Sequence, residues 1–223
     1  MTRFKVCCIR DEVEVKAAVG AGASAVGFVS AMPSGPGPIP EDVIARLLPA
    51  VPPGVSSFLL TSLTAPDALA EQHRRLPTDT VQLVDRLPSG SYREARRLLP
   101  GVRLVQVVHV EGPEAVDAVR RVAGHVDAIL LDSGRPGAEV PELGGTGRAH
   151  DWSVSRRVVE AVDVPVWLAG GLSGDNVAEA VATVRPFGVD VCSGVRTDGR
   201  LDTGKLDAFA GGIGRARNGT ADG

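Results

Sequence analysis

Short runs of branched apolar residues alternate along the chain with amphipathic segments rich in Ala, Glu and Arg. This alternation is typical of repeated strand-helix units. It predicts eight strands, at residues 4–9, 25–29, 55–60, 80–83, 103–108, 128–131, 164–168 and 188–191. Helices are expected between them, near residues 12–20, 41–48, 66–74, 91–99, 113–122, 153–162 and 175–184, with a last helix after residue 203.

Local signals support these helix starts. Pro40, Pro66 and Pro113 stand beside acidic residues at the predicted first turns, where proline and carboxylates suit a helix. The repeated units favour an α/β protein with one domain, a (β/α)8 TIM barrel over residues 1–214, and the polar tail at 215–223 is expected to be disordered. A doubly wound open sheet is the main alternative, but the expected glycine motif after its first strand is missing from residues 8–11.

The composition of the chain disfavours several classes of function. The 223 residues include 24 basic and 27 acidic side chains, a formal charge of -3, and no block of like charge, which disfavours nucleic-acid and anionic-membrane binding. No apolar run approaches the length of a membrane span and no signal-peptide core is seen, so we expect a cytoplasmic protein. The three cysteines are an odd and badly spaced set for a disulfide framework, and no pair suggests zinc. A reduced, metal-free protein is therefore expected.

The first strand carries the first candidate for chemistry. Side chains alternate along a strand, so Lys5 and Cys7 share one face while Cys8 lies on the other. A charged lysine is poorly suited to the helix layer, so we expect Lys5 and Cys7 to point into the barrel and Cys8 to pack outward. A buried cysteine is usually a small hydrophobic residue. Near the barrel mouth, however, a cation such as Lys5 would lower the pKa of the Cys7 thiol and make it a candidate base.

The sixth strand carries the second candidate. Its apolar run ends in Asp132, and apolar walls around a carboxyl group raise its pKa, as a general acid requires. The alternative is an aspartate that caps its own loop. Asp127, at the other end of the strand, is expected at the structural end of the barrel.

Glycine-containing loops follow strands seven and eight. Gly170 and Gly171 follow strand seven, and Ser193 and Gly194 follow strand eight. Glycines here let backbone N–H groups approach an anion, and these two loops form the usual phosphate site of a TIM barrel. Glycine is also the default turn residue, so each pair alone is weak evidence. Together they predict a phosphorylated small-molecule substrate.

Two long loops, at residues 30–40 and 133–151, follow strands two and six and so belong to the expected catalytic face. The first is rich in proline and glycine, and a poorly ordered connection is an equal alternative. The second contains Gly145 and Arg148, which suit a lid with one guanidinium group, the alternative being an ordinary mobile loop.

Several motifs occur together in the order and spacing of one family: Lys5-Val6-Cys7, Gly27-Phe28-Val29, Val81-Gln82-Leu83, Leu130-Leu131-Asp132-Ser133, Gly144-Gly145-Thr146-Gly147, Ala169-Gly170-Gly171-Leu172 with Asn176, and Asp190-Val191 with Ser193-Gly194-Val195. Through them the chain resembles phosphoribosylanthranilate isomerase over nearly its whole length. The resemblance implies an aldose-ketose isomerase of tryptophan biosynthesis that performs an Amadori rearrangement and needs no cofactor. By the same resemblance Asp132 would be the general acid and Cys7 the base.

Together, the sequence patterns and the resemblance predict a set of residues that contact the substrate or its phosphate. These are Gly170, Gly171, Ser193, Gly194, Lys5, Asp190, Gly145, Arg148 and Arg10. We expect a monomer or a homodimer.

Three departures from the family pattern concern the amine half of the substrate. Pro36 stands where the family carries an arginine for the anthranilate carboxylate, residues 84–85 replace a histidine and a glycine, and residues 8–10 replace glycine, isoleucine and threonine. Arg10 or Arg148 are the candidate replacements for the missing arginine. Two alternatives therefore stay open: the same chemistry on another aminosugar phosphate, or a barrel that binds a sugar phosphate without catalysis.

Overall fold

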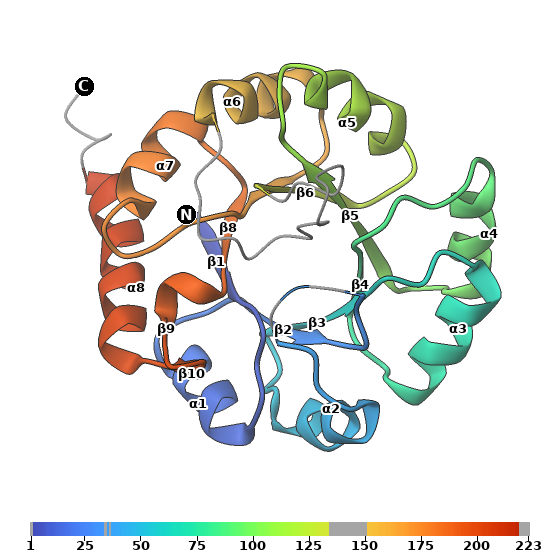
Figure 1. Cartoon of the computed structure of the whole chain (residues 1–223), viewed down its shortest axis with the longest axis horizontal. Helices are drawn as coiled ribbons and strands as arrows, with labels where there is room; N and C mark the ends of the chain where they lie inside the picture. Colours follow the sequence, from blue (N-terminus) through green and yellow to red (C-terminus); the bar gives the residue numbers. More distant parts are fainter. Residues whose placement is uncertain (1, 34, 36, 134–150, 219–223) are drawn as a thin grey trace.

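The computed structural model describes residues 2–33, 35, 37–133 and 151–218. Within these residues, parallel strands close a barrel in chain order from β1 to β8, and β1 pairs with β8 to complete it. The helices form a ring around the barrel (Figure 1). The predicted TIM barrel is therefore confirmed.

The barrel strands lie within a few residues of the predicted ones. They are β1 (Arg3–Val6), β2 (Ala25–Val29), β3 (Ser56–Thr61), β4 (Thr80–Leu83), β5 (Arg103–His109), β6 (Ala128–Asp132), β7 (Val166–Leu168) and β8 (Gly188–Val191). The sequence pattern does not indicate the short antiparallel hairpin of β9 (Arg196–Thr197) and β10 (Arg200–Leu201) that follows β8.

The helices also follow the predicted order. They are α1 (Glu12–Gly20), α2 (Glu41–Leu47), α3 (Pro66–Arg75), α4 (Ser91–Leu98), α5 (Ala115–Ala123), α6 (Trp152–Ala161), α7 (Val177–Val184) and α8 (Thr203–Asn218), with 3-10 helices η1 (Leu48–Ala50) and η2 (Ser193–Val195). Local chemistry sets their starts: the Asp11 carboxylate accepts the N–H of Glu14 at 2.9 Å, and Pro66 occupies the first turn of α3.

Alternation along the strands builds two apolar layers. Side chains such as Val6 and Leu131 face the helices and belong to the large cluster that joins barrel and helix ring. Side chains such as Cys7 and Trp167 belong to a smaller cluster inside the barrel. Burial of each Val, Leu or Ile side chain contributes roughly 1.5–3 kcal/mol to the free energy of folding. The many aliphatic side chains can therefore stabilise the core although few aromatic rings are present.

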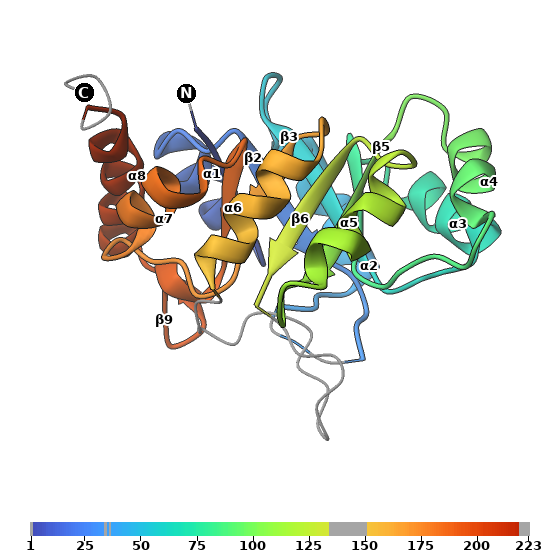
Figure 2. The ribbon, with the colours of Figure 1, turned by 90° about the horizontal axis from the view of Figure 1, so that it is seen from above.

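The functional end of the barrel is defined by the strand direction. All eight barrel strands run the same way, and the chain that follows β2 lies at the same end as the β9–β10 hairpin (Figure 2). Asp127 lies at the opposite end, where Arg96 Nη1 contacts its Oδ2 at 2.7 Å. The expected structural role of Asp127 fits this position.

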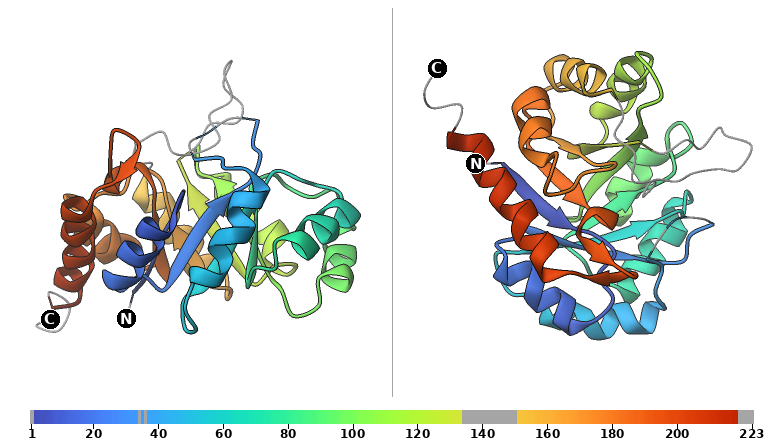
Figure 3. Two further views of the ribbon diagram at one scale, coloured as in Figure 1. Left: turned by 90° about the horizontal axis from the view of Figure 1, so that it is seen from below. Right: turned by 60° about the vertical axis from the view of Figure 1, so that its left-hand side comes forward.

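The last helix extends beyond the barrel boundary expected at residue 214. Helix α8 continues to Asn218 and lies beside α7 (Figure 3). Phe209 and Ile213 are buried in the core, and this packing outweighs the weak helix propensity of the nearby glycines. Residues 219–223 lie outside the described part of the chain.

Among the described residues, no helix has the length and apolar character that crossing a bilayer requires.

Candidate active site

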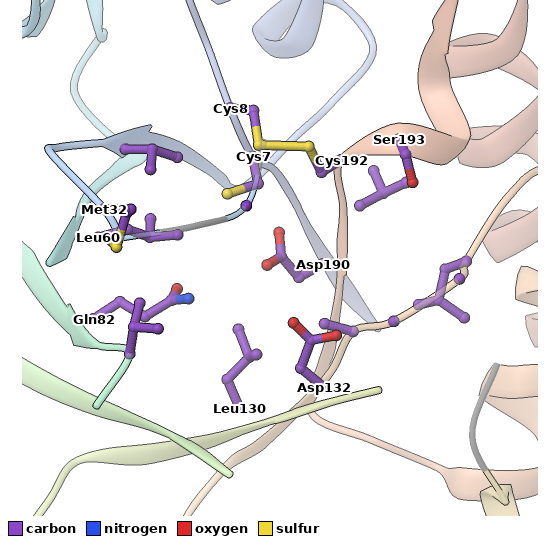
Figure 4. A pocket seen from close by; sticks show the side chains of 18 residues that line it. Cys7, Cys8, Met32, Leu60, Gln82, Leu130, Asp132, Asp190, Cys192 and Ser193 are labelled. Atoms are coloured by element: carbon purple, nitrogen blue, oxygen red, sulfur yellow. A yellow bond between two sulfur atoms is a disulfide. The ribbon is translucent and has the colours of Figure 1, made fainter. Parts of the chain in front are cut away.

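A cavity lies at the carboxyl ends of the barrel strands. Figure 4 shows Cys7 from the end of β1, Asp132 from β6 and Asp190 from β8 around one space. Their convergence depends on barrel closure, since β1 and β8 are neighbours only when the sheet is closed. The described residues that line the cavity are Cys7, Cys8, Val29, Met32, Gly35, Leu60, Gln82, Val84, Leu130, Asp132, Ala169, Gly170, Gly171, Leu172, Asp190, Val191, Cys192 and Ser193.

Lys5 forms a buried network beneath the cavity. Its Nζ lies 3.0 Å from Oδ2 of Asp190, 2.7 Å from Oε1 of Gln82 and 4.0 Å from Sγ of Cys7. The side chain has no exposed surface, and burial acts to lower its pKa, but the charge of Asp190 and its hydrogen bond to Lys5 act in the opposite direction, and the pKa is raised. Lys5 therefore keeps its positive charge. Its side chain points into the barrel, as the alternation along the strand predicts.

The Cys7 thiol is the free cysteine of the structure and is 4% exposed. Burial raises the pKa of this thiol to about 11, although the Lys5 ammonium acts in the opposite direction. The network thus limits the cost of forming a thiolate but does not make it the resting form of the side chain.

We expect iodoacetamide to modify Cys7 at a rate that still rises between about pH 8 and about pH 11, because only the thiolate reacts and its population grows tenfold per pH unit below the pKa. The measurement is mass spectrometry of the labelled peptide in non-reducing buffer, where the other two cysteines are joined to each other. Cys7→Ser is the control for labelling elsewhere. A rate that levels off near neutral pH would contradict the expected thiol pKa.

Asp132 is the candidate acid. Burial raises the pKa of its carboxyl group, although the N–H of Ser133, 2.7 Å from Oδ1, and the charge of Lys5 partly oppose this. The capping contact that the alternative interpretation predicts is thus present. The carboxyl group also faces the cavity, so the same geometry supports a proton donor (Figure 4).

The expectation that Cys8 packs outward in a reduced protein is wrong. Strand β1 ends at Val6, and Cys8 adopts a left-handed backbone conformation with φ of 63°, so the alternation of the strand no longer applies. Cys8 forms a disulfide with Cys192, which lies 184 residues away at the end of β8. Sequence spacing could not reveal this pair, because the two cysteines meet only through the pairing of β1 with β8.

The two glycine-containing loops meet at one side of the cavity. Gly170 and Gly171 have φ of 87° and 65°, the left-handed region that favours glycine. Gly194 lies directly against the carbonyl of Leu172, so a side chain at position 194 would collide with that backbone. The loops after β7 and β8 therefore pack as one unit, with Gly170, Gly171 and Ser193 lining the cavity.

Not every predicted contact residue reaches the cavity. Arg10 is exposed and its Nη1 donates to the carbonyl of Gly199 at 3.4 Å, away from the lining residues. Lys5 is enclosed by Asp190 and Gln82 and does not line the cavity. Gly145, Arg148 and Pro36 lie outside the described residues.

Two polar residues to which the sequence alone assigns no role organise the site. Gln82, on β4, binds Lys5, and Asn176 holds the loop after β7 by donating to the carbonyl of Gly171 and accepting the N–H of Ser173, both at 2.9 Å. The signal for Gln82 is an amide inside an apolar strand, which requires a buried polar partner. No group of His, Cys, Asp and Glu suited to a metal ion occurs among the described residues.

The sequence of this chain matches one protein family over most of its length. The model of the family described as PRAI, N-(5'phosphoribosyl)anthranilate (PRA) isomerase, matches residues 4–211. The N-(5'-phosphoribosyl)anthranilate isomerase of Halobacterium salinarum is 40% identical over 213 residues, covering 94% of this chain and 94% of the relative. The protein of the same name from Haloferax volcanii is 39% identical over 226 residues, covering 100% and 97%.

Solved structures give the same result. The phosphoribosyl anthranilate isomerase of Thermotoga maritima has a TM-score of 0.81 and 28% identity, covering 98% of this chain and all of that one. A phosphoribosyl anthranilate isomerase in complex with reduced 1-(o-carboxyphenylamino)-1-deoxyribulose 5-phosphate has a TM-score of 0.79 and 25% identity, covering 96% and 100%.

Proposed function

The chain belongs to the N-(5'-phosphoribosyl)anthranilate isomerase family, and on that premise we propose that Cys7 and Asp132 carry out its isomerisation of N-(5'-phosphoribosyl)anthranilate. The product is 1-(2-carboxyphenylamino)-1-deoxyribulose 5-phosphate, an intermediate of tryptophan biosynthesis. The observation that carries this proposal is the placement of a thiol and a carboxyl group around one cavity beside the two glycine-containing loops.

Asp132 begins the reaction as general acid. Its carboxyl group, whose pKa burial raises, donates a proton to the ring oxygen of the ribose. The bond between C1 and that oxygen breaks while the amine nitrogen donates its electron pair to C1, which gives an open-chain iminium ion. Asp132 is left as a carboxylate, which the nearby Lys5 charge helps to stabilise.

Cys7 completes the reaction as general base. Its thiolate takes the proton from C2 of the iminium ion, and the C–H electron pair forms the double bond of an enolamine. Return of a proton to C1 and loss of the enol proton give the ketone, so no atom is gained or lost overall. Lys5, 4.0 Å from the sulfur, favours the thiolate during this step.

The loops after β7 and β8 are proposed to bind the phosphate. Gly170, Gly171 and Ser193 line the cavity on this side, where backbone N–H groups suit an anion. Asp190, paired with Lys5, lines the same cavity and is placed to accept a hydrogen bond from a ribose hydroxyl group (Figure 4). Arg10 is not retained as a contact residue.

The opposite wall suits the aromatic amine. Val29, Met32, Leu60 and Val84 give an apolar surface against which a flat ring can pack. None of the described lining residues is basic, so any partner for the anthranilate carboxylate comes from elsewhere, and Arg148 remains the proposed residue. Family membership favours anthranilate over a different amine or a non-catalytic role.

The direct test is an assay of the purified protein with N-(5'-phosphoribosyl)anthranilate, followed by the loss of its fluorescence. Rescue of a tryptophan auxotroph that lacks this step is the second test. Wild-type protein that neither turns over the substrate nor restores growth would remove the assigned substrate. A monomer or homodimer and a cytoplasmic location remain proposals, which size-exclusion chromatography and cell fractionation would test.

Gly194→Ala is expected to raise KM about tenfold or more and to lower stability by about 1–3 kcal/mol, because the added methyl group would displace the loop after β7. Steady-state kinetics and thermal unfolding measure the two effects. Gly20→Ala is the matched control: it ends α1, no atom lies within 4 Å of the added carbon, and it should leave KM unchanged. Equal KM values in both variants would exclude the proposed phosphate loop.

A further inference from the structure

A buried ion pair lies behind the turn that carries Cys7. Arg196 follows η2 at the start of β9, and Glu14 lies in the first turn of α1. Nη1 of Arg196 is 2.8 Å from Oε1 of Glu14, and Nη2 is 3.0 Å from Oε2, so the contact is bidentate. Each side chain is only 8% exposed, which removes the pair from most solvent screening.

The same guanidinium holds the backbone of the catalytic turn. Nη2 of Arg196 also donates to the carbonyl of Cys8 at 2.6 Å and to the carbonyl of Cys7 at 3.3 Å. Cys8 has φ of 63°, a conformation that residues other than glycine adopt only when their surroundings hold them. The charge of Arg196 therefore acts on the peptide groups that orient the Cys7 side chain.

Glu14 extends the contact to both neighbouring segments. Its Oε2 accepts the N–H of Arg10 at 3.0 Å, and its Oε1 accepts the N–H of Leu201 on β10 at 3.1 Å. One carboxylate thus joins the turn after β1 to the hairpin that follows the phosphate loop. The two strand ends that carry the base and the anion site are linked through this pair.

We propose that Arg196 and Glu14 form a positioning pair for the isomerase reaction, which fixes the Cys7 thiol relative to the loop after β8. The proposal rests on the function proposed above. A general base must lie within hydrogen-bond reach of the proton that it removes, and a displacement of about 1 Å can cost about a hundredfold in rate. An ion pair that served stability alone would need only opposite charges at the two positions. A positioning pair also needs a hydrogen-bond donor at position 196 for the carbonyl groups of Cys7 and Cys8.

The charge-swapped double variant Glu14→Arg/Arg196→Glu separates these roles. It keeps opposite charges in the two positions but turns a carboxylate toward the carbonyl oxygens of Cys7 and Cys8. We expect kcat to fall at least about thirtyfold with KM within about threefold, and the alkylation rate of Cys7 to change across the pH range. Wild-type kcat and an unchanged alkylation profile in the swapped variant would overturn the proposal.

Arg196→Lys keeps the experiment decisive if the swapped variant does not fold. Lysine retains the charge but cannot make the bidentate contact and both carbonyl contacts together, so kcat should fall about tenfold while Tm changes little. Wild-type kcat in this variant would contradict the proposal. Arg96→Met is the control: Arg96 pairs with Asp127 at the far end of the barrel, and its loss should lower Tm without lowering kcat.

Failure of the proposed function would be recognised separately. Wild-type protein without isomerase activity would refute the substrate assignment, whereas the alkylation profile of Cys7 does not need the substrate. An Arg196→Lys profile identical to the wild-type profile would still refute positioning by the pair.

Discussion

Asp132→Asn is expected to lower kcat by about 10²–10⁴ while KM changes little, because asparagine keeps the shape of the side chain but cannot donate the proton that opens the ribose ring. Asparagine can still accept the N–H of Ser133 through its carbonyl oxygen, so the loop contact survives the substitution. The effect should therefore appear in the chemical step and not in folding. Steady-state kinetics with thermal unfolding of the same preparation measure both.

Asp127→Asn is the matched control for Asp132→Asn. Asp127 immediately precedes β6, pairs with Arg96 and accepts the N–H of Leu104 at 2.7 Å, so its substitution should lower Tm and leave kcat within about threefold of wild type. A wild-type kcat in Asp132→Asn would exclude this carboxyl group as the acid. A rate loss as large in Asp127→Asn would assign the effect to general destabilisation.

Cys7→Ala is expected to lower kcat by about 10³ or more, because alanine has no group that can take the proton from C2. Cys7 is buried and its N–H donates to the carbonyl of Val191 at 2.8 Å, a backbone contact that alanine keeps. Substrate and product affinity should therefore stay close to wild type. Kinetics with substrate deuterated at C2 provide the measurement, since proton removal at that carbon is the step that the thiolate performs.

Cys192→Ser is the control for Cys7→Ala. It removes the disulfide with Cys8 but leaves the Cys7 thiol, so kcat should stay within about tenfold of wild type while Tm falls, since the cross-link closes a long loop. Full activity in Cys7→Ala would exclude the thiol as the base. Equal losses in the two variants would assign the effect to the turn instead of the sulfur.

Much of the site could be predicted because it lies at strand ends. Continuous runs of branched apolar residues locate the strands, and the alternation of side chains along the first strand orients Lys5 and Cys7 inward. Asp132 is identified in the same way, as the acid that ends an apolar strand. Arg10 does not line the described cavity, because the left-handed Cys8 interrupts the strand parity before it and the exposed Arg10 side chain donates to the carbonyl of Gly199.

The sequence by itself determined the repeated strand-helix order and the strand-end positions of the thiol and the acid, since both depend on short-range patterns, and the number of repeated units predicted the barrel. Only the tertiary structure decided which distant groups meet: Cys8 with Cys192, Arg196 with Glu14, and Lys5 with both Gln82 and Asp190. The physical reason is that these partners are selected by the register of strands that pair across the closed barrel and by the turns beyond them. That information belongs to the packed chain, because no local pattern specifies which buried charge or sulfur will lie opposite another.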